Sequence, residues 1–417
     1  MLCSSRNEWI ETDLPDAFWF QEGPGVRNWQ FTTSGIKLLN VANITKTGTI
    51  DLSKTDRCLS IEEVQQKYNH FLVDSGDLVI ASSGISFDTD DLLRTRGAFV
   101  STNHLPLCMN TSTIRFKAKE GISDLNFLKF WLDSLEFRQQ VTRFVTGSAQ
   151  QNFGPSHLKE IKISLPPIEE QKRIAAIAQK CDRLRRTRRY TRQLSDSYLR
   201  SVFLEMFGDP VTNSMDWEIL DLGSQLKKIE SGWSPVCEEA SRTSINDWAV
   251  LRLSAVTSGK YRPEENKILP TNLAPRFELE VRQGDFLITR KNTFNLVAAC
   301  ALVHTTPPKL ILPDTIFRFV LKKSCRVNST YLWGLFSESF FRKKVQSLAT
   351  GTAGSMPNIS KEKFLDLLIP VPSFPLQEKF ARFVQRFERL RTQQREADRQ
   401  AEHLFQTVLH RAFRGEL

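Results

Sequence analysis

The sequence predicts a mixed α/β (α+β) protein in which two globular segments alternate with two long helices. Two observations carry this prediction. A stretch typical of one long helix occurs twice, and the segments before the two copies match at their edges. We expect the helices to pair as an antiparallel coiled coil with pseudo-two-fold internal duplication. The expected boundaries are 1–165 for the first globular segment, 166–208 for the first helix, 209–369 for the second globular segment and 370–417 for the second helix.

The two helical stretches align without a gap when Gln171 is set against Gln377. Apolar residues then recur three and four positions apart, which is the spacing of a coiled-coil seam. Roughly 37 helical residues at about 1.5 Å each give a rod of about 55 Å. The residues expected in the seam are Ile174, Ile177, Cys181, Leu184, Tyr198 and Val202 in the first copy, and Phe380, Phe383, Phe387, Leu390, Leu404 and Val408 in the second.

The duplication extends into the globular segments. Gly76-Asp77 matches Gly284-Asp285, and Phe137-Arg138 matches Phe341-Arg342, at offsets between 204 and 212 residues. The centres of the two segments are dissimilar. Two modules with the same task and different targets would show this pattern, and so would drift after duplication.

Composition limits the protein class. A chain of 417 residues with 40% hydrophobic and 25% charged residues is ordinary for a globular protein of two or three domains. No 18-residue apolar run predicts a membrane span, and the first residues do not read as a secretory signal. Seven scattered cysteines without a CxxC pair fit a reducing compartment, so we expect a cytoplasmic protein. The net charge of +10 favours a polyanionic partner, most commonly nucleic acid.

A search for catalytic chemistry gives no candidate. The sequence contains neither a GxxxxGK[ST] loop nor a GxGxxG turn after a strand. Glu170 falls in the first turn of a predicted helix, where the macrodipole favours an acid, and the six histidines lack metal-ligand spacing. We therefore expect no catalytic residue, no metal ligand and no cofactor in this chain.

DNA-binding side chains are better supported, as a set of polar loops. Arginine can read guanine, and asparagine or glutamine can read adenine. The competing interpretation is that each loop is merely a solvated surface. An arginine-rich run at 183–192 on the first helix is either a solvated face or a contact to phosphate or to an acidic partner. The candidates are Arg27, Asn28, Gln30, Ser82, Ser83, Gln151, Asn152, Arg290, Lys291, Asn292 and Asn295.

With the duplication, the helix start LPPIEEQKRIAAI and the tail FRGEL, the chain resembles the specificity subunits of type I restriction-modification enzymes. The resemblance covers essentially the full length. Its specific part is the pair of helical regions, opened by Pro166, Pro167, Glu170 and Gln171 in the first copy and by Pro370, Pro372, Gln377 and Glu378 in the second.

The resemblance implies a function. Each globular segment would be a target recognition domain that reads one half of a bipartite site on double-stranded DNA. The paired helices would act as a spacer and dock two modification (methyltransferase) subunits. S-adenosylmethionine, ATP and Mg would bind to partner subunits, including the restriction subunits of the full complex. Two alternatives remain open: a DNA methyltransferase or endonuclease with unrecognised motifs, and a coiled-coil scaffold that does not bind DNA.

Overall fold

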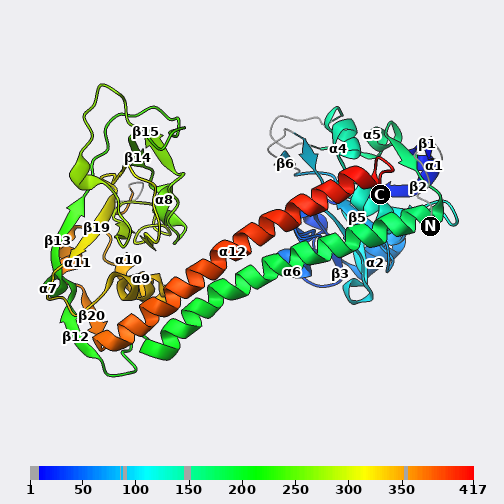
Figure 1. Cartoon of the computed structure of the whole chain (residues 1–417). Coiled ribbons are helices and arrows are strands. Elements are labelled where there is room, and N and C mark those ends of the chain that lie inside the picture. Colours follow the sequence, from blue (N-terminus) through cyan, green and yellow to red (C-terminus); the bar gives the residue numbers. More distant parts are fainter. Residues whose placement is uncertain (1–8, 85, 88–91, 145–151, 352–355) are drawn as a thin grey trace. The chain divides into compact units, whose positions relative to one another are not determined.

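The computed structural model describes residues 9–84, 86–87, 92–144, 152–351 and 356–417 (Figure 1). The chain divides into two compact units. The first unit extends to Tyr190 and includes Arg395–Leu417, and the second unit is Thr191–Gln394. Two long helices, α6 (Ile168–Phe207) and α12 (Phe374–Ala412), each contribute one half to each unit.

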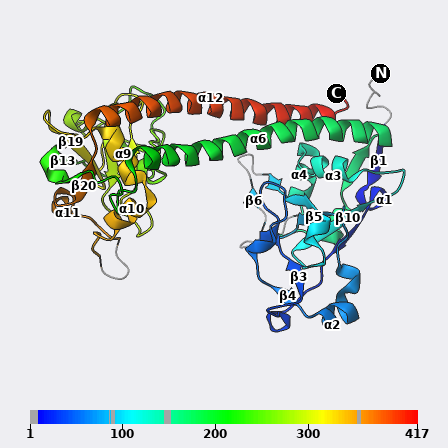
Figure 2. The same ribbon diagram turned by 90° about the horizontal axis from the view of Figure 1, so that it is seen from below.

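The first unit contains a four-stranded antiparallel sheet in the order β2-β10-β5-β8 and a three-stranded sheet in the order β4-β3-β9, in which β3 and β9 are parallel. Figure 2 shows β3, β4 and α2 grouped together in this unit. The strands are β1 (Ile10–Asp13), β2 (Phe18–Glu22), β3 (Ile36–Leu39), β4 (Cys58–Leu59), β5 (Leu78–Ala81), β6 (Ser86–Phe87), β7 (Leu93–Arg94), β8 (Gly97–Phe99), β9 (Leu107–Met109), β10 (Thr113–Ala118) and β11 (Lys162–Leu165). The short helices are α1 (Leu14–Ala17), α2 (Ile61–Glu63), α3 (Leu125–Trp131), α4 (Leu135–Thr142) and α5 (Pro155–Lys159).

The second unit repeats this topology. Its four-stranded sheet has the order β13-β19-β16-β17, and its three-stranded sheet has the order β15-β14-β18 with β14 and β18 parallel. The strands are β12 (Glu218–Asp221), β13 (Leu226–Ser231), β14 (Ala249–Leu251), β15 (Asn266–Ile268), β16 (Phe286–Thr289), β17 (Cys300–Leu302), β18 (Leu310–Ile311), β19 (Ile316–Leu321) and β20 (Leu368–Val371). The short helices are α7 (Leu222–Gln225), α8 (Ser254–Thr257), α9 (Ser329–Ser337), α10 (Ser339–Gln346) and α11 (Lys361–Leu365). The predicted fold class and internal duplication are confirmed, and the duplication includes the sheets whose sequences diverged.

The repeated Gly-Asp pair has the same structural role in both units. Gly76 and Gly284 have φ angles of +95° and +89°, a left-handed conformation in which glycine avoids the strain of a side chain. The aspartate that follows accepts a hydrogen bond from the main-chain N–H three residues earlier, at 2.9 Å for Asp77 and 2.8 Å for Asp285. Each aspartate also pairs with a buried arginine on the next strand, Asp77 with Arg115 at 3.6 Å and Asp285 with Arg318 at 3.0 Å.

The two long helices are antiparallel within each unit. In the first unit, Arg173 Nη2 donates to the main-chain oxygen of Leu417, and Arg185 pairs with Glu402 farther along. In the second unit, Gln394 Nε2 donates to Ser195 Oγ at 3.2 Å, and Phe380 packs edge-to-face on Phe203. Partner numbers fall as the α6 numbers rise, so the helices run in opposite directions.

The predicted seam is partly displaced. Ile174, Phe380 and Phe387 are buried, and Ile177, Cys181, Val202, Phe383 and Val408 are half-buried. Leu184, Tyr198, Leu390 and Leu404 are instead exposed, although Tyr198 still contacts Phe383 and Phe387. The buried positions lie one residue later, at Leu199, Phe203, Phe405 and Leu409.

The displacement has a physical reason. Helices turn every 3.6 residues, so a face predicted from an ideal heptad drifts along a 40-residue helix. Here Phe203 packs against Tyr331 of α9, and Phe405 packs against Phe130 of α3. The buried face therefore follows the globular cores as well as the sister helix. Within the described ranges, no helix is long and apolar enough to cross a membrane.

Candidate nucleic-acid interface

In the first unit, the end of β5 meets the segment that returns after α4. Ser83 forms a β-bridge with Asn152, and Phe153 N–H donates to the main-chain oxygen of Ser82 at 3.1 Å. The Ser82 side chain is buried, Ser83 is half-buried and Asn152 is exposed. Gln151 lies outside the described residues. The structure thus brings two of the predicted polar loops together at one strand end.

The second unit has the same arrangement at the end of β16. Lys291 forms a β-bridge with Asn358, and Ile359 N–H donates to the main-chain oxygen of Arg290 at 2.9 Å. Asn292 N–H donates to the Pro357 oxygen at 3.2 Å. The arrangement is therefore a duplicated feature, with Ser82–Ser83 and Arg290–Lys291 in equivalent places.

The side chains at the second strand end differ in their availability. Arg290 Nε donates to the Asp314 main-chain oxygen at 2.8 Å, and its guanidinium lies over the Phe317 ring. Asn292 is only 5% exposed. Its Oδ1 accepts from Thr293 N–H, while its Nδ2 has no hydrogen-bond partner in the part of the chain that the structure describes. Lys291 and Asn295 are exposed. Among these candidates, Lys291 and Asn295 are the most accessible to a ligand.

Sequence reasoning missed an adjoining basic helix. The α10 residues Arg342 and Gln346 donate to main-chain oxygens of the loop that follows Asn292, Arg342 to Asn295 and Gln346 to Phe294. Lys343 and Lys344 on this helix are exposed. The signal was present in the sequence SFFRKKVQ, in which Phe341 and Val345 bury one face and the lysines occupy the other.

The loop at 22–31 belongs to a different part of the first unit. Arg27 and Asn28 are exposed, but Gln30 is only 8% exposed. Gln30 Nε2 donates to Glu63 Oε1 at 2.7 Å and to Tyr68 Oη at 2.9 Å, and its Oε1 accepts from Arg27 N–H. The prediction of Gln30 as a base-reading residue is therefore corrected, because internal hydrogen bonds occupy its amide.

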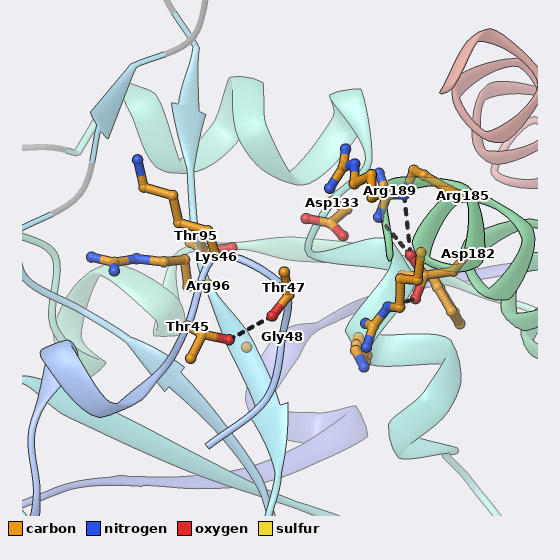
Figure 3. Close-up of a pocket in the computed structure, with 14 residues that line it drawn as sticks. Thr45, Lys46, Thr47, Gly48, Thr95, Arg96, Asp133, Asp182, Arg185 and Arg189 are labelled. Atoms are coloured by element: carbon orange, nitrogen blue, oxygen red, sulfur yellow. Dashed lines mark hydrogen bonds and ion pairs between the residues drawn. The ribbon is translucent and has the colours of Figure 1, made fainter. Parts of the chain in front are cut away.

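Part of the arginine-rich run on α6 is paired inside the first unit. Arg185 lies 2.6 Å from Asp182 and 3.1 Å from Glu402, and Arg189 lies 2.9 Å from Glu402. Arg186 lies 2.7 Å from Asp182. Figure 3 shows Asp182, Arg185 and Arg189 on one side of a polar cavity, with the Thr45–Gly48 turn on the other. These arginines thus form an ion-pair network at the helix surface.

The described residues contain no group of three or more His, Cys, Asp or Glu side chains that could hold a metal ion.

Comparisons with known proteins agree on one family. Residues 33–192 match the family model described as a type I restriction modification DNA specificity domain. The chain is 32% identical over 203 residues to the type I restriction enzyme EcoEI specificity subunit of Escherichia coli, a match covering 49% of this chain and 34% of that protein. It is 22% identical over 328 residues to the MjaVIII specificity subunit of Methanocaldococcus jannaschii, covering 74% of both.

Solved structures share the fold over nearly the whole chain. One solved structure comes from work on complex assembly and conformational transition of the type I R-M system. It has a TM-score of 0.56 at 17% identity, covering 98% of both chains. The crystal structure of the type I restriction-modification S subunit from M. genitalium has a TM-score of 0.55 at 14% identity, covering 97% of this chain and 96% of that one. Residues 33–192 thus resemble a type I restriction modification DNA specificity domain, and the curated relatives that the chain matches are type I specificity subunits, of which the chain spans about a third of the first and about three quarters of the second. The solved structures show that the fold is shared.

Proposed function

We propose that the chain is a non-catalytic DNA-recognition subunit that reads a bipartite target, one half-site per globular unit. The proposal rests on the duplicated strand end. In both units a later loop forms a β-bridge and a main-chain hydrogen bond just after an inner strand of the four-stranded sheet, β5 in the first unit and β16 in the second. The same scaffold carries serine and asparagine in one unit and arginine, lysine and asparagine in the other. Different side chains on one scaffold are suited to reading different bases.

Charge supports binding to a phosphate backbone. The net charge is +10, and the exposed Lys291, Lys343 and Lys344 lie on or beside the second strand end. Phosphate contacts of this kind supply affinity that depends on salt, while contacts to base edges supply specificity. The exposed Arg27 and Asn28 are further candidates in the first unit, as are Ser83 and Asn152.

The remaining parts of the proposal follow from the similarity to type I specificity subunits. The long helices would dock two modification subunits, and exposed apolar side chains such as Leu184, Leu194 and Leu390 are a candidate surface for this contact. S-adenosylmethionine, ATP and Mg would act on the partner subunits, including restriction subunits. The expected site of action is the cytoplasm, on double-stranded DNA.

A map of N6-methyladenine across the source genome, with and without the gene for this chain, tests the proposal. The expected result is a split motif that is methylated in the parent and unmethylated after deletion. If the motif persists, another protein specifies it. If neither strain shows a split motif, capture of the modification subunit by this chain distinguishes an inactive system from a wrong assignment.

We also propose that α6 and α12 help to set the gap between the half-sites. Deleting one matched heptad from each helix removes about 10 Å of helix, which corresponds to roughly three base pairs. The same methylation map should then show both half-motifs with a shorter gap. An unchanged gap would exclude the helices as the spacer.

Replacing Lys291 by alanine should weaken reading of one half-site and leave the other intact. Loss of one specific contact costs about 1–3 kcal/mol, or roughly a 5- to 150-fold loss of affinity. Lys291 is preferable to Arg290, whose loss would also remove its internal bond to Asp314. Binding is measured with duplexes that carry both half-sites, or either one scrambled.

The matched control is Lys227→Ala, which removes an exposed lysine from β13 of the same unit. It should retain parental discrimination at both half-sites. Equal discrimination by the Lys291→Ala protein would remove this strand end from the recognition surface.

A further inference from the structure

A polar cavity of about 70 Å³ lies in the first unit, walled by α6, α3 and two turns of the chain (Figure 3). By the same measure a water molecule needs about 10–15 Å³, so the cavity has room for a small ion. A more open groove of about 350 Å³ shares Lys129, Asp182 and Arg186 with it. The cavity and the groove therefore adjoin each other at these residues.

Two cationic groups converge over Gly48 in this cavity. The position that a Cβ atom would take at Gly48 lies 3.1 Å from Arg186 Nη2 and 3.9 Å from Lys129 Nζ. Gly48 has a φ of +72°, so a left-handed turn and the absence of a side chain together keep this space open. The main-chain oxygen of Gly97 lies 3.1 Å from the same position, so the two cationic groups approach the surface of this turn beside a carbonyl oxygen.

Lys129 does not form an ion pair of the kind that its neighbours on α6 form. Asp182 pairs with Arg185 and Arg186, whereas no carboxylate forms an ion pair with Lys129 within the part of the chain covered by the structure. Its ammonium lies over the Phe99 ring instead, at 5.3 Å. Burial, and then the nearby charge of Arg186, lower the pKa of Lys129, and the charges of Asp182 and Asp133 offset this only in part. A bound anion would offset this cost of holding a half-buried cation.

A comparison with the second unit distinguishes the residues of this network that both units share from those present only in the first unit. The α6 pair Asp182–Arg185 has its counterpart on α12 in Glu388–Arg391, which is also ion-paired. The alignment that matches Asp124 with Asn328 and Gln171 with Gln377 places Trp333 at the position of Lys129 and Thr392 at that of Arg186. Trp333 is buried and packs near His304. The duplicated fold therefore does not need the Lys129–Arg186 pair.

We propose that Lys129 and Arg186, together with the Gly48 turn, bind a phosphate group, carried either by the DNA backbone or by a free phosphate compound. Thr45 and Thr47 of the same turn add hydroxyl groups to the wall, although their Oγ1 atoms also bond to each other at 2.8 Å. The carboxylates of Asp133 and Asp182 line the cavity as well. They are outnumbered by the cationic side chains of Lys129, Arg185, Arg186 and Arg189, so the cavity lining is positively charged.

The cavity adjoins the strand end of the first unit. Arg96, which lines the cavity, donates to the main-chain oxygen of Gly84 at 3.3 Å, just after Ser82 and Ser83. Figure 3 shows the charged ends of Lys46 and Arg96 pointing away from Asp182, so these two side chains are not counted as part of the site. The location favours a phosphate of bound DNA, and this choice of source rests on the proposed function.

Binding of two probes to the full chain tests the proposal: a mixed-sequence DNA duplex and inorganic phosphate. The variants are Lys129→Gln and Arg186→Gln. If the phosphate belongs to DNA, each should weaken duplex binding about 3- to 10-fold and reduce the slope of log K against log salt by about one. If it is free phosphate, calorimetry should show saturable binding to the parent that both variants lose.

Arg188→Gln is the matched control, since it removes the same charge from an exposed position on α6 outside the cavity. If Arg186→Gln unfolds because its pair with Asp182 is lost, Lys129→Gln still tests whether the cavity binds phosphate. Parental duplex slope and parental phosphate binding in Lys129→Gln would overturn the proposal. Failure of the parent to bind any duplex would count against the proposed function, and the phosphate titration would still decide whether the cavity binds the anion.

The pH dependence gives a second readout. Asp133 faces Lys129, Arg94 and Arg185 as well as the carboxylate of Asp182, and desolvation by the surrounding groups raises its pKa to about 6, although part of the residue is exposed to solvent. As the pH falls through about 6, Asp133 becomes neutral, so affinity for the non-titrating phosphates of a duplex should rise. Asp133→Asn should have this higher affinity already at neutral pH. An identical pH profile in the parent and in Asp133→Asn would show that Asp133 does not act on the site.

Discussion

Replacing Arg318 by leucine is expected to destabilise the second unit by about 3–5 kcal/mol, enough to unfold a marginally stable domain. Arg318 lies on β19 and is only 7% exposed. Its guanidinium pairs with Glu230 at 2.6 Å and Asp285 at 3.0 Å, and it donates to the main-chain oxygens of Glu278 and Glu280. Leucine would leave two carboxylates and two carbonyls without this donor.

Urea unfolding followed by circular dichroism measures the effect, and hydrogen exchange assigns it to the second unit. Arg326→Leu is the control, because it removes an arginine whose pair with Glu218 is exposed. Exposed pairs contribute little to stability, so its midpoint should stay close to that of the parent. A parental midpoint for Arg318→Leu would mean that the buried network contributes nothing net to folding.

The destabilisation should also depend on pH. Burial opposes ionisation of Glu230, but Lys228 and Arg318 overcome it and hold its pKa below the usual value. In the parent, this stabilisation is present at neutral pH and is lost as the pH falls through the lowered pKa. Without Arg318, a carboxyl group can become neutral more readily in acid. The difference between parent and variant should therefore shrink as the pH decreases.

The helices and the duplication were predictable because they depend on local patterns. Prolines mark each long helix start, and three- and four-residue spacing continues through both copies. Local patterns were less informative over about 124–145, where apolar residues recur at helical spacing but the structure has two helices, α3 and α4. Ser134 begins the second helix and accepts a hydrogen bond from Phe137 N–H. The N-cap serine was visible in the sequence, but the apolar residues on both sides of it keep helical spacing and therefore do not mark a break.

The sheets and the cavity depend on contacts between distant segments. The sequence showed the Gly-Asp pairs, but not that each aspartate meets an arginine on another strand. The sequence indicated the polar loops but not that two of them meet at one strand end in each unit. The role of Gln30 was misassigned because Glu63 and Tyr68, which bond to its amide, lie more than 30 positions away. The Lys129–Arg186 site draws on α3, α6 and the Gly48 turn, so no local spacing could indicate it.

Replacing Gln171 or Gln377 by leucine should cost about 3 kcal/mol in the unit that contains it. Both glutamines are fully buried at the start of a long helix. Gln171 accepts from Asp124 N–H and donates to the oxygens of Ile122 and Pro166. Gln377 makes the equivalent three bonds with segments of the second unit. Leucine has a similar volume, so the cost arises mainly from one N–H and two carbonyls left unpaired.

The duplication provides an internal comparison for this prediction. Gln400→Leu, on the exposed surface of α12 where the Gln400 side chain donates to Glu396, should leave the unfolding midpoint nearly unchanged. The two buried replacements lie in separate units, so their costs should add in the double variant. Parental stability in both single variants would contradict the proposed role of the glutamines. Equal costs in the two units would indicate that each helix start is fixed by the same three hydrogen bonds, a constraint that persisted while the surrounding sheets diverged.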